Sequence, residues 1–302
     1  MSSKNENKMF TRDDVIVGIV TFNPEVGRLE ENIAAVSKQV SSIVIADNGS
    51  ENFAEIETLI AKVVSSRNDV GNESGLRVKI LKNEKNDGIA AALSQIMDYA
   101  DEEAYKWVLT LDQDSVIEPG LVNAYLNVAN DTKYADAGML TCLIQDRNFR
   151  DEKYEKQDAP VMEVGYCITS AAFTSVKAYM KTSGYDKKFF IDAVDFDICY
   201  SLRKSGFKVY RVNHVGLYHE VGHGENRRFL WKTIVVYHQK PFRIYYFARN
   251  MIWLHKKHRR LYGILKLTKK ELALFTRILL YEDNRKEKMS SFWRGIGDGR
   301  TY

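Results

Sequence analysis

The chain has 302 residues, of which 45% are hydrophobic, with 4 prolines, 18 glycines and a formal net charge of +4. These values exclude an intrinsically disordered chain and predict one large domain, or one domain with an appendage. The first 14 residues are polar, and we see no uninterrupted apolar run of about 18 or more residues. We therefore expect a cytoplasmic protein with no signal peptide and no membrane-spanning helix.

The first half of the chain alternates predicted strands with predicted helices. In chain order, the ranges are a strand at 15–20, a helix at 29–39, a strand at 42–46, a helix at 53–64, a strand at 78–81, an alanine-rich helix at 88–99 and a strand at 107–111. Such alternation predicts an α/β fold with a mostly parallel, doubly wound sheet and helices on both of its faces.

The second half has a different pattern. We expect strands and turns at 137–144 and 161–173, a helix at 195–205 that ends at Gly206, a strand at 208–212, and helices after Phe229. Three cysteines lie in apolar stretches without a C-x-x-C motif, namely Cys142, Cys167 and Cys199. They are expected to be buried free thiols in a reducing compartment.

Polar residues follow each of the four strands of the first half. They are Thr21 and Asn23, Asp47 and Asn48, Asn83, Asn86 and Asp87, and finally Asp112 and Asp114. Each group has a plainer interpretation, because Asp-Asn-Gly is a common turn and Asn-Asp-Gly can cap a helix. Taken together they predict one polar edge of the sheet, at the carboxyl ends of the strands where ligands bind.

The sequence Asp112-Gln113-Asp114 emerges where a buried strand ends. Two carboxylates there can hold Mg²⁺ or Mn²⁺ against a diphosphate, because such cations prefer a few carboxylates plus phosphate oxygens. A bare Asp-x-Asp is weak by itself, since the chain has 40 acidic residues. Asp47 could accept the N3–H of a uracil or thymine ring, and the helix that begins at Gly88 could face negative charge.

The positive charge is concentrated near the C-terminus. From Arg227 to Lys270 there are 13 Lys and Arg and no Asp or Glu, which leaves 31 basic and 40 acidic residues elsewhere. One predicted helical face holds Ile244, Phe247, Met251 and Leu254, and nearby cations are Arg249, Lys256, Lys257, Arg259 and Arg260. The pattern suits an interfacial helix on anionic lipid. A solvated helix face is the alternative, and no nucleic-acid motif accompanies the patch.

Four motifs together resemble the inverting glycosyltransferase family 2, which has a GT-A fold. They are Gly18-Ile19-Val20-Thr21-Phe22-Asn23, Asp47-Asn48-Gly49-Ser50, Asn86-Asp87-Gly88-Ile89-Ala90 and Leu111-Asp112-Gln113-Asp114. The resemblance covers roughly residues 15–255 and is strongest to bacterial rhamnosyltransferases of cell-wall and surface polysaccharide assembly. It implies a nucleotide-sugar-binding half at 13–115, an acceptor-binding half at 116–225 and a basic, aromatic, helical appendage at 226–302.

The resemblance also implies roles on the donor side. Asp47 would bind the pyrimidine base, with Thr21, Asn23, Asn86 and Asp87 beside it. Asp112 and Asp114 would hold the metal and the donor diphosphate, and His219 would complete the metal site. Tyr245, Tyr246, Arg249 and Asn250 resemble a downstream Tyr-Tyr-x-x-Arg-Asn element, so Arg249 is expected to contact the donor.

On the acceptor side, Asp195 falls on the position of the family's general base, and Val194 replaces the usual Glu. An aspartate beside Phe189, Phe190 and Phe196 lies in an apolar setting, which would raise its pKa toward a useful range. Asp192 or Asp197 could share the role, and the plain alternative is that one of the three caps the helix. Thr169 and Ser170, together with Asp192, are expected to line the acceptor pocket.

The sequence therefore predicts a metal-dependent transfer of L-rhamnose from dTDP-β-L-rhamnose to a saccharide, carried on a polyprenyl diphosphate at the inner face of the cell membrane. Expected partners are the nucleotide-sugar donor, this lipid-linked acceptor and the anionic membrane surface, but no nucleic acid; a homodimer stays open. The alternatives are a UDP-hexose donor and a catalytically silent scaffold at the membrane. A nucleotidyltransferase is disfavoured, because residues 21–29 lack a glycine-rich triphosphate loop.

Overall fold

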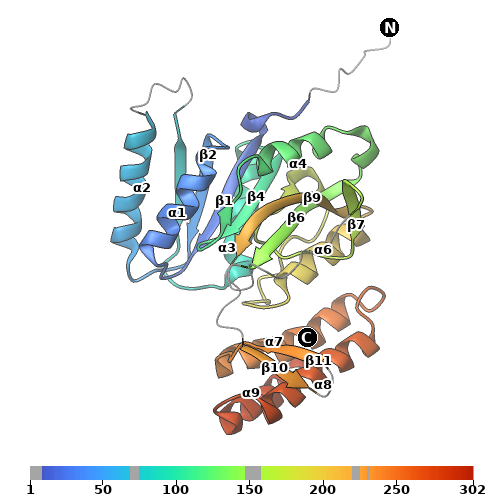
Figure 1. The fold of residues 1–302 in the computed structure, drawn as a ribbon. Helices are drawn as coiled ribbons and strands as arrows, with labels where there is room; N and C mark the ends of the chain where they lie inside the picture. The colour runs from blue at the N-terminus through green and yellow to red at the C-terminus, as the bar shows by residue number, and fades with distance from the viewer. Residues whose placement is uncertain (1–8, 69–74, 147–157, 220–224, 230–231, 302) are drawn as a thin grey trace.

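The computed structural model describes residues 9–68, 75–146, 158–219, 225–229 and 232–301. Within them, one mixed sheet with helices on both faces forms the main body, and the C-terminal helices form a separate layer at one end of it (Figure 1). The α/β architecture predicted from the alternating pattern is confirmed.

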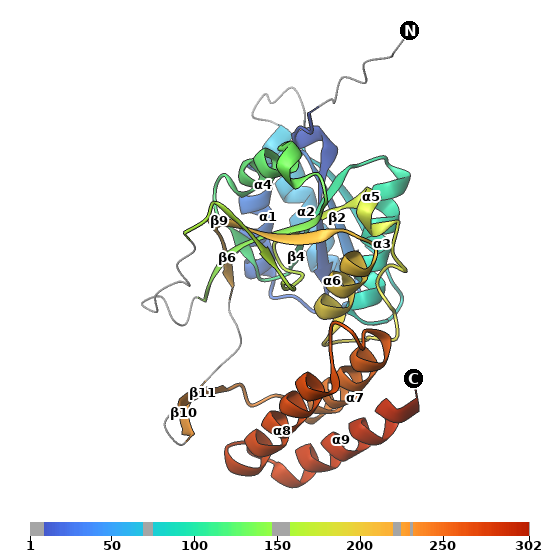
Figure 2. The same ribbon diagram turned by 90° about the vertical axis from the view of Figure 1, so that its right-hand side faces the viewer.

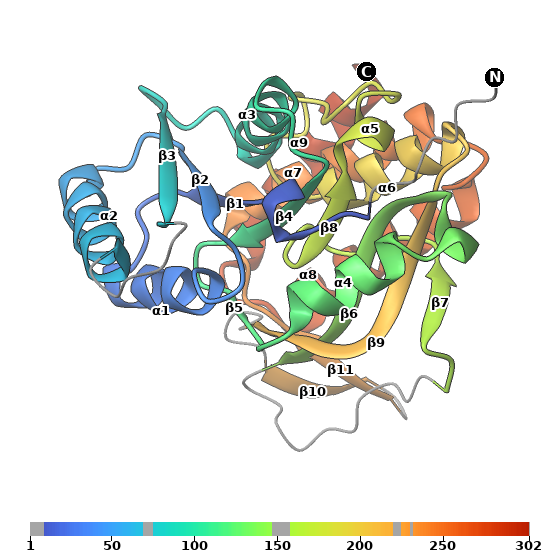
Figure 3. The same cartoon turned by 90° about the horizontal axis from the view of Figure 1, so that it is seen from above.

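The first half of the sheet is parallel, in the order β3-β2-β1-β4. These strands are β1 (Val15–Thr21), β2 (Ser42–Asp47), β3 (Arg77–Lys82) and β4 (Trp107–Asp112). The crossover helices are α1 (Val26–Val36), α2 (Phe53–Asn68) and α3 (Ile89–Glu102). The central strands are buried on both faces, because α1 and α2 cover one side of the sheet and α3 the other (Figure 3). This is why they read as continuous apolar runs.

The second half of the sheet continues from β4 in the order β8-β6-β9-β5, and β7 pairs with β9. The strands are β5 (Val116–Ile117), β6 (Ala137–Asp146), β7 (Val161–Val164), β8 (Ala172–Ser175) and β9 (Lys208–His219). Between them lie α4 (Leu121–Ala129), α5 (Val176–Tyr179) and α6 (Val194–Lys204), with short 3₁₀ turns η1 (Arg12–Asp14) and η2 (Thr132–Tyr134). Because β8 is antiparallel to both β4 and β6, β6 runs parallel to β4 and ends at the same edge.

The C-terminal part contains a hairpin and three helices. Its elements are β10 (Glu225–Phe229), β11 (Lys232–Val236), α7 (Pro241–Lys257), α8 (Ile264–Leu280), α9 (Arg285–Asp298) and the 3₁₀ turn η4 (Gly299–Thr301). The expectation of helices directly after Phe229 is therefore wrong for 232–236. Thr233, Ile234, Val235 and Val236 are β-branched, and such residues favour a strand.

The face of α7 that was expected to rest on lipid is buried inside the protein. Ile244 and Met251 are each 1% exposed and Leu254 is 0% exposed. Met251 and Leu254 pack into the main core, whereas Ile244 packs against α8 and α9. The sequence-based assignment of this face to a membrane is thus wrong. An apolar helical stripe has the same spacing whether it meets lipid or a protein core.

Two other expectations concern the cysteines and the membrane. Cys142 and Cys199 are buried, Cys167 is half-buried, and all three are free thiols, as predicted. Burial raises the pKa of the Cys142 thiol to about 11, so it is unreactive at neutral pH. Across the described residues, no helix is both long enough and apolar enough to cross a membrane.

Candidate active site

The parallel strands bring the predicted polar edge together. Thr21, at the end of β1, is in register with Asp47 at the end of β2, and the preceding Val20 is in register with Asp112 at the end of β4. The carboxyl ends of these three strands therefore lie at one level. In Figure 1 this edge faces the layer of α7–α9, toward which the arrow of β6 points.

Asp47 lies beneath this edge and organises the loop that follows it. Its side chain is 0% exposed. Oδ1 accepts hydrogen bonds from Thr21 Oγ1 at 2.9 Å and from Ser50 Oγ at 2.5 Å, and Oδ2 accepts one from the Ser50 backbone N–H at 3.0 Å. A carboxylate offers about four acceptor positions, and three of those of Asp47 are filled by these hydrogen bonds. Asn23 supports the same loop, because its Oδ1 accepts from the Glu51 N–H at 2.8 Å.

A network of side-chain amides fixes the loop before α3. Asn48 Nδ2 donates to Asn86 Oδ1 at 3.1 Å, and Asn86 Oδ1 also accepts from the Gly88 N–H at 2.9 Å. Asn48 Oδ1 accepts from the Asp87 N–H at 3.3 Å. Asn86 therefore holds the entry to α3, whereas the exposed Asp87 carboxylate pairs with Lys85 at 3.5 Å.

The backbone of Asp112 is held from two sides. Asn32 Nδ2 donates to the Asp112 carbonyl at 2.7 Å, and the Asp112 N–H donates to Ser170 Oγ at 3.3 Å. Ser170 is 0% exposed and shares a 2.7 Å hydrogen bond with Ser115. The Ser170 hydroxyl thus supports the backbone of Asp112. It is not exposed at the surface, where it could contact an acceptor substrate. Thr169, which was expected to line the acceptor pocket with Ser170, is half-buried.

Asp112 and Asp114 fit a divalent cation. Both are partly exposed, and within the described residues the Asp114 carboxylate makes no hydrogen bond or ion pair. Gln113 between them is engaged, because its Oε1 accepts from the Phe22 N–H at 2.8 Å. Mg²⁺ is usually held by one or two carboxylates plus substrate phosphates, so these two residues are a sufficient protein contribution. His219 ends β9, and its side chain lies outside the part of the chain that the structure describes.

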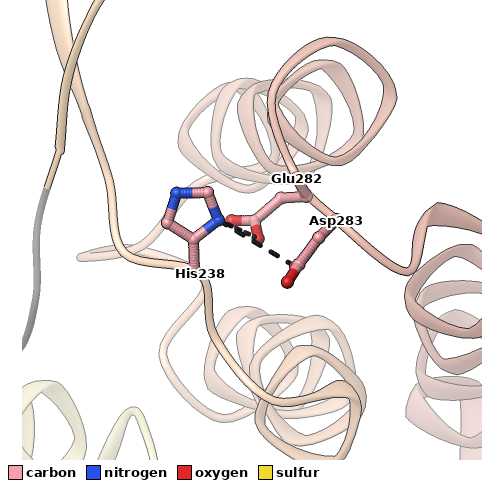
Figure 4. Close-up of side chains that lie close together, drawn as sticks. All are labelled: His238, Glu282 and Asp283. Atoms are coloured by element: carbon pink, nitrogen blue, oxygen red, sulfur yellow. Dashed lines mark ion pairs between the residues drawn. The ribbon is translucent and has the colours of Figure 1, made fainter.

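A second cluster of potential metal ligands lies where the segment between β11 and α7 meets the connection between α8 and α9 (Figure 4). His238 Nδ1 lies 3.6 Å from a Glu282 carboxylate oxygen and 3.9 Å from one of Asp283. The ammonium group of Lys288, only 3% exposed, contacts both carboxylates, at 2.7 Å in the case of Glu282. Because a cation is already in place, we interpret this cluster as an internal ion-pair network.

The loop at 188–193 precedes the predicted catalytic helix α6 and has an unusual backbone. Asp192 and Ala193 have positive φ angles of 65° and 66°, a conformation that costs non-glycine residues about 1–3 kcal/mol each. Asn250 Nδ2 donates to the carbonyl oxygens of Ile191 at 2.7 Å and Asp192 at 3.1 Å. Arg243 forms a 2.7 Å ion pair with Asp192. Helix α7 thus holds the strained turn in place.

The same loop also contacts the start of α3. The Ile89 N–H donates to the Phe190 carbonyl at 2.9 Å, and the Phe190 ring stacks on Tyr246 of α7 at 5.2 Å. Gly88 has a φ of +89°, and a Cβ atom there would lie 2.6 Å from the Phe190 carbonyl oxygen. Only glycine therefore fits at this position, and the loop joins the start of α3 to α7.

Asp195 lies in the first turn of α6, which has Ala193 as its N-cap and no side-chain cap. None of the nearby aspartates caps this helix, contrary to the plain alternative. Burial raises the pKa of Asp195 to about 6, and the negative charges of Asp192 and Asp112 add to the effect. A carboxylate with this pKa is ionised near pH 7 and still basic enough to take a proton.

Asp197 has a different environment. It is 1% exposed, and its two carboxylate oxygens accept from His258 Nε2 at 2.7 Å and Lys257 Nζ at 2.9 Å. Lys257 also pairs with Asp186 at 3.0 Å. Both carboxylate oxygens of Asp197 are therefore engaged by the end of α7, which leaves Asp195 as the better candidate for a base. Asp192 keeps one oxygen, Oδ2, that is buried without a hydrogen-bond partner among the described residues.

Arg249 braces the loop from α7. Its guanidinium group lies 4.0 Å from the Trp253 ring and 4.6 Å from the Tyr246 ring, and it donates to the Lys188 carbonyl at 2.9 Å. Its Nε also donates to Asn250 Oδ1 at 2.9 Å. These contacts place Arg249 next to the loop at 188–193, and they connect the Arg-Asn pair of the predicted motif to the loop that precedes α6.

Sequence reasoning missed an aromatic surface beside Asp195. Tyr166 is 51% exposed, and its ring lies 4.6 Å from that of Phe196, the residue after Asp195. It also missed Arg243, the ion-pair partner of Asp192. No local motif marks either residue, because each acquires its place from contacts between distant parts of the chain.

Similar solved structures define the fold as that of the GT-A glycosyltransferases. The structure superimposes on Staphylococcus aureus TarS 1–349 with a TM-score of 0.62 and 14% identity, covering 94% of this chain and 79% of that one. It also superimposes on GalNAc-T7 with UDP, GalNAc and Mn²⁺, with a TM-score of 0.61 and 15% identity. In that comparison, 97% of this chain spans 57% of the other protein.

The model of "Glycosyl transferase family 2" matches residues 16–208. The chain therefore belongs to this family and is a glycosyltransferase. A curated relative, the dTDP-rhamnosyl transferase RfbF of Shigella flexneri, is 23% identical over 303 residues, which cover 94% of this chain and 97% of the relative.

Proposed function

We propose that this glycosyltransferase is inverting and that Asp195 is its general base. The observation that carries the proposal is the position of Asp195, in the first turn of α6, with a pKa raised to about 6 by burial and by the charges of Asp192 and Asp112. Inverting transfer needs a base on the acceptor side and charge stabilisation on the side of the leaving diphosphate. Asp195 and the pair Asp112 and Asp114 match these two needs.

In the proposed reaction, an acceptor hydroxyl gives its proton to Asp195, and its oxygen forms a bond to the anomeric carbon of the donor sugar. The bond between that carbon and the diphosphate oxygen breaks, and the nucleoside diphosphate leaves with the electron pair. A divalent cation held by Asp112 and Asp114 would stabilise the negative charge of the diphosphate. Asp192, Arg243 and Asn250 hold the turn that orients Asp195.

For the donor, we favour dTDP-β-L-rhamnose, because the relative that matches nearly the whole chain is named a dTDP-rhamnosyl transferase. The remaining acceptor position of Asp47 would take the N3–H of the thymine ring. Uracil carries the same N3–H group, so a UDP-hexose is the alternative donor, and the nucleotide experiment below distinguishes the two.

For the acceptor, we favour a saccharide attached to a polyprenyl diphosphate at the inner face of the cell membrane. The exposed ring of Tyr166, which lies against that of Phe196 next to Asp195, supports a sugar acceptor, because aromatic rings offer an apolar face with a polar rim. Thr169 and the buried Oδ2 of Asp192 would provide hydrogen bonds.

A thermal-shift titration tests the proposal. The protein is heated with dTDP, UDP or GDP, each with Mg²⁺, with Mn²⁺ or with a chelator. We expect dTDP plus metal to raise Tm most, and we expect the effect to disappear in Asp114→Ala. A larger shift with UDP would overturn the choice of donor. No shift with any nucleotide would overturn the enzymatic assignment of the site and favour a catalytically silent scaffold.

A further inference from the structure

Helix α8 exposes an apolar stripe on the side that faces away from the protein. Leu265, Leu272 and Leu279 are 75%, 62% and 50% exposed. They are seven residues apart, which is close to two helical turns, so they lie on one face. The opposite face packs into the protein through Leu267, Leu274 and Ile278. The exposed leucines are therefore not part of any core formed by the described residues.

Three further residues widen this stripe. Ile264 and Leu280 of α8 are 58% and 46% exposed, and Trp293 of α9 is 58% exposed. The Trp293 ring is 6.1 Å from that of Phe275, a partly buried residue of α8 that packs against the core shared by α7, α8 and α9. We call these six residues, Ile264, Leu265, Leu272, Leu279, Leu280 and Trp293, the α8 face. Soluble monomers rarely expose such a contiguous apolar surface without a partner.

Positive charges surround the α8 face. Helix α8 itself carries Lys266, Lys269, Lys270 and Arg277, and its acidic residue Glu271 is on the inner side. Residues 241–302 contain 15 Lys and Arg and 5 Asp and Glu, whereas the rest of the chain contains 29 and 35. The apolar face thus belongs to the positively charged part of a chain that is otherwise acidic. Its partner should be apolar inside and negative at its surface.

We propose that the α8 face rests on an anionic lipid bilayer, with its leucines at the level of the acyl chains and its lysines among the lipid head groups. Leucine and tryptophan on one side and lysine beside them are the features of an interfacial helix. Basic residues beside the apolar face are attracted to the negative charge of such a surface. This inference rests on the proposed function, in which the acceptor is carried by a membrane lipid.

A second copy of the chain is a poorer occupant. A coiled coil needs two apolar positions in each heptad and opposite charges beside them. The second core position of these heptads is the polar Thr268 in one case, and in the next it is Phe275, which already packs against the core of α7, α8 and α9. Two copies would also bring like charges together. The charge pattern therefore favours lipid over self-association.

The position of α8 is compatible with this role. The layer of α7–α9 lies at the edge of the sheet that carries Asp112, and α7 contacts the loop that precedes Asp195 (Figure 2). Helix α8 packs on α7 through Leu274, Ile278 and Ile244. A bilayer under α8 would thus lie on the same side of the molecule as the active site, where a lipid-linked acceptor would be presented.

Vesicle co-sedimentation of the full chain tests the inference. The vesicles contain phosphatidylcholine alone, or phosphatidylcholine with 30% phosphatidylglycerol. We expect binding to the anionic vesicles and a loss of at least tenfold in the partition coefficient for the variant Leu265→Ser, Leu272→Ser, Leu279→Ser. The matched control is Met180→Ser, which replaces a residue of similar exposure, 50%, at the end of α5. Equal binding of the wild type and the leucine variant would overturn the inference.

A charge variant and a fluorescence measurement complete the test. Lys266→Gln with Lys269→Gln and Lys270→Gln should weaken binding to the anionic vesicles at least tenfold, whereas Lys38→Gln with Lys79→Gln and Lys106→Gln should not. Tryptophan emission should shift to shorter wavelength with anionic vesicles, and this shift should be lost in Trp293→Phe. A dimer that depends on the three leucines and does not bind vesicles would overturn the inference in favour of a second copy.

The outcome is separable from that of the proposed function. The same leucine variant is heated with dTDP and Mg²⁺ in the absence of lipid, where it should show the Tm shift of the wild type. Vesicle binding without any nucleotide shift would support the α8 face and overturn the enzymatic proposal. A Tm shift with nucleotide in a wild-type protein that binds no vesicles would support the enzymatic proposal and overturn the membrane role of the α8 face.

Discussion

The side-chain amide of Asn250 donates a hydrogen bond to the backbone carbonyl of Asp192, with the nitrogen 3.1 Å from the oxygen. The same amide group donates to Ile191 at 2.7 Å. Asn250 is 0% exposed, and Asp192 has a positive φ of 65°. Asn250 of α7 therefore stabilises a strained turn at Asp192, which is 58 positions away in sequence. This turn leads directly into α6, the helix that carries Asp195.

Replacement of Asn250 by Ala should lower kcat because the turn at Asp192 and Ala193 would lose its two amide donors. Two unpaired buried carbonyl groups cost about 1–3 kcal/mol each. The turn can avoid this cost by relaxing to a commoner backbone conformation, which would displace Asp195. We expect a fall in kcat of about 10- to 100-fold, with little change in the Kd for dTDP. Steady-state kinetics and a nucleotide titration on the same preparation measure both quantities.

The control for this experiment is Asn123→Ala, at an exposed asparagine of α4 that contacts Arg12. It should leave both kcat and nucleotide binding unchanged. Asn250→Asp keeps the size of the side chain but removes the donors, so it should behave like Asn250→Ala. Wild-type kcat in both Asn250 variants would show that α7 does not position the base.

The rate of transfer should rise with pH and then level off above about pH 6. In the proposed mechanism Asp195 must be ionised to accept the proton, and burial together with Asp192 and Asp112 raises its pKa to about 6. The limb of the kcat/KM profile below this pH belongs to the free enzyme. Asp195→Asn should fold, bind dTDP and lose at least 10²-fold in kcat, which is the usual size of a general-base contribution.

The same pKa shift predicts an effect on stability of opposite sign. Because the folded-state pKa of Asp195 is above the usual value of 3.8, the wild type loses stability as the pH rises from about 4 to 6. Asp195→Asn removes this loss, so the variant should have a higher Tm than the wild type at pH 8 and a similar Tm at pH 4. A lower Tm for the variant at pH 8 would contradict the burial argument.

Removal of the divalent cation should abolish donor binding more than it affects the fold. Asp114 has no protein partner among the described residues, so Asp114→Ala should leave the Tm of the nucleotide-free protein within about 1 °C. Its Kd for dTDP with Mg²⁺ should rise at least tenfold, to the value of the wild type with chelator. Asp101→Ala, at an exposed aspartate of α3, is the matched control and should bind dTDP normally.

Much of the fold follows from local sequence pattern. The strands β1 to β4 are apolar runs of six or seven residues, and their alternation with helices predicts the parallel half of the sheet. The hairpin of β10 and β11 was missed because 225–236 mixes basic and β-branched residues without a hairpin turn signal. The buried face of α7 was assigned to lipid because amphipathic spacing does not identify the partner of a helix.

The candidate site was predictable where it depends on strand ends and not where it depends on long-range contacts. The polar groups at the ends of β1, β2 and β4 follow from position alone. The contacts of the individual side chains do not follow from position. Asn86 and Ser170 support neighbouring backbone groups, and Asp197 is paired with His258. The loop at 188–193 depends on residues about 60 positions later, such as Asn250, and no local pattern reports such a contact.

The inner side of α8 carries a titratable group whose removal should stabilise the protein. Both carboxylate oxygens of Glu271 are buried and have no hydrogen-bond partner among the described residues. Burial raises the pKa of Glu271 to about 8 from its ordinary value of 4.5. The folded state therefore binds the proton more tightly than the unfolded state. The free energy of unfolding should therefore fall as the pH rises from about 4.5 to 8, and then level off.

Glu271→Gln keeps the shape of the side chain and removes the charge. The variant should melt at a higher temperature than the wild type at pH 8.5, by about 4 °C if the shift is worth about 2 kcal/mol, and by much less at pH 5. Thermal denaturation followed by circular dichroism at both pH values measures the difference. Glu57→Gln, at an exposed position of α2, should show no such pH-dependent gain. An equal Tm difference at the two pH values would mean that Glu271 is not desolvated, and that the contact of α8 with α7 is looser than the structure places it.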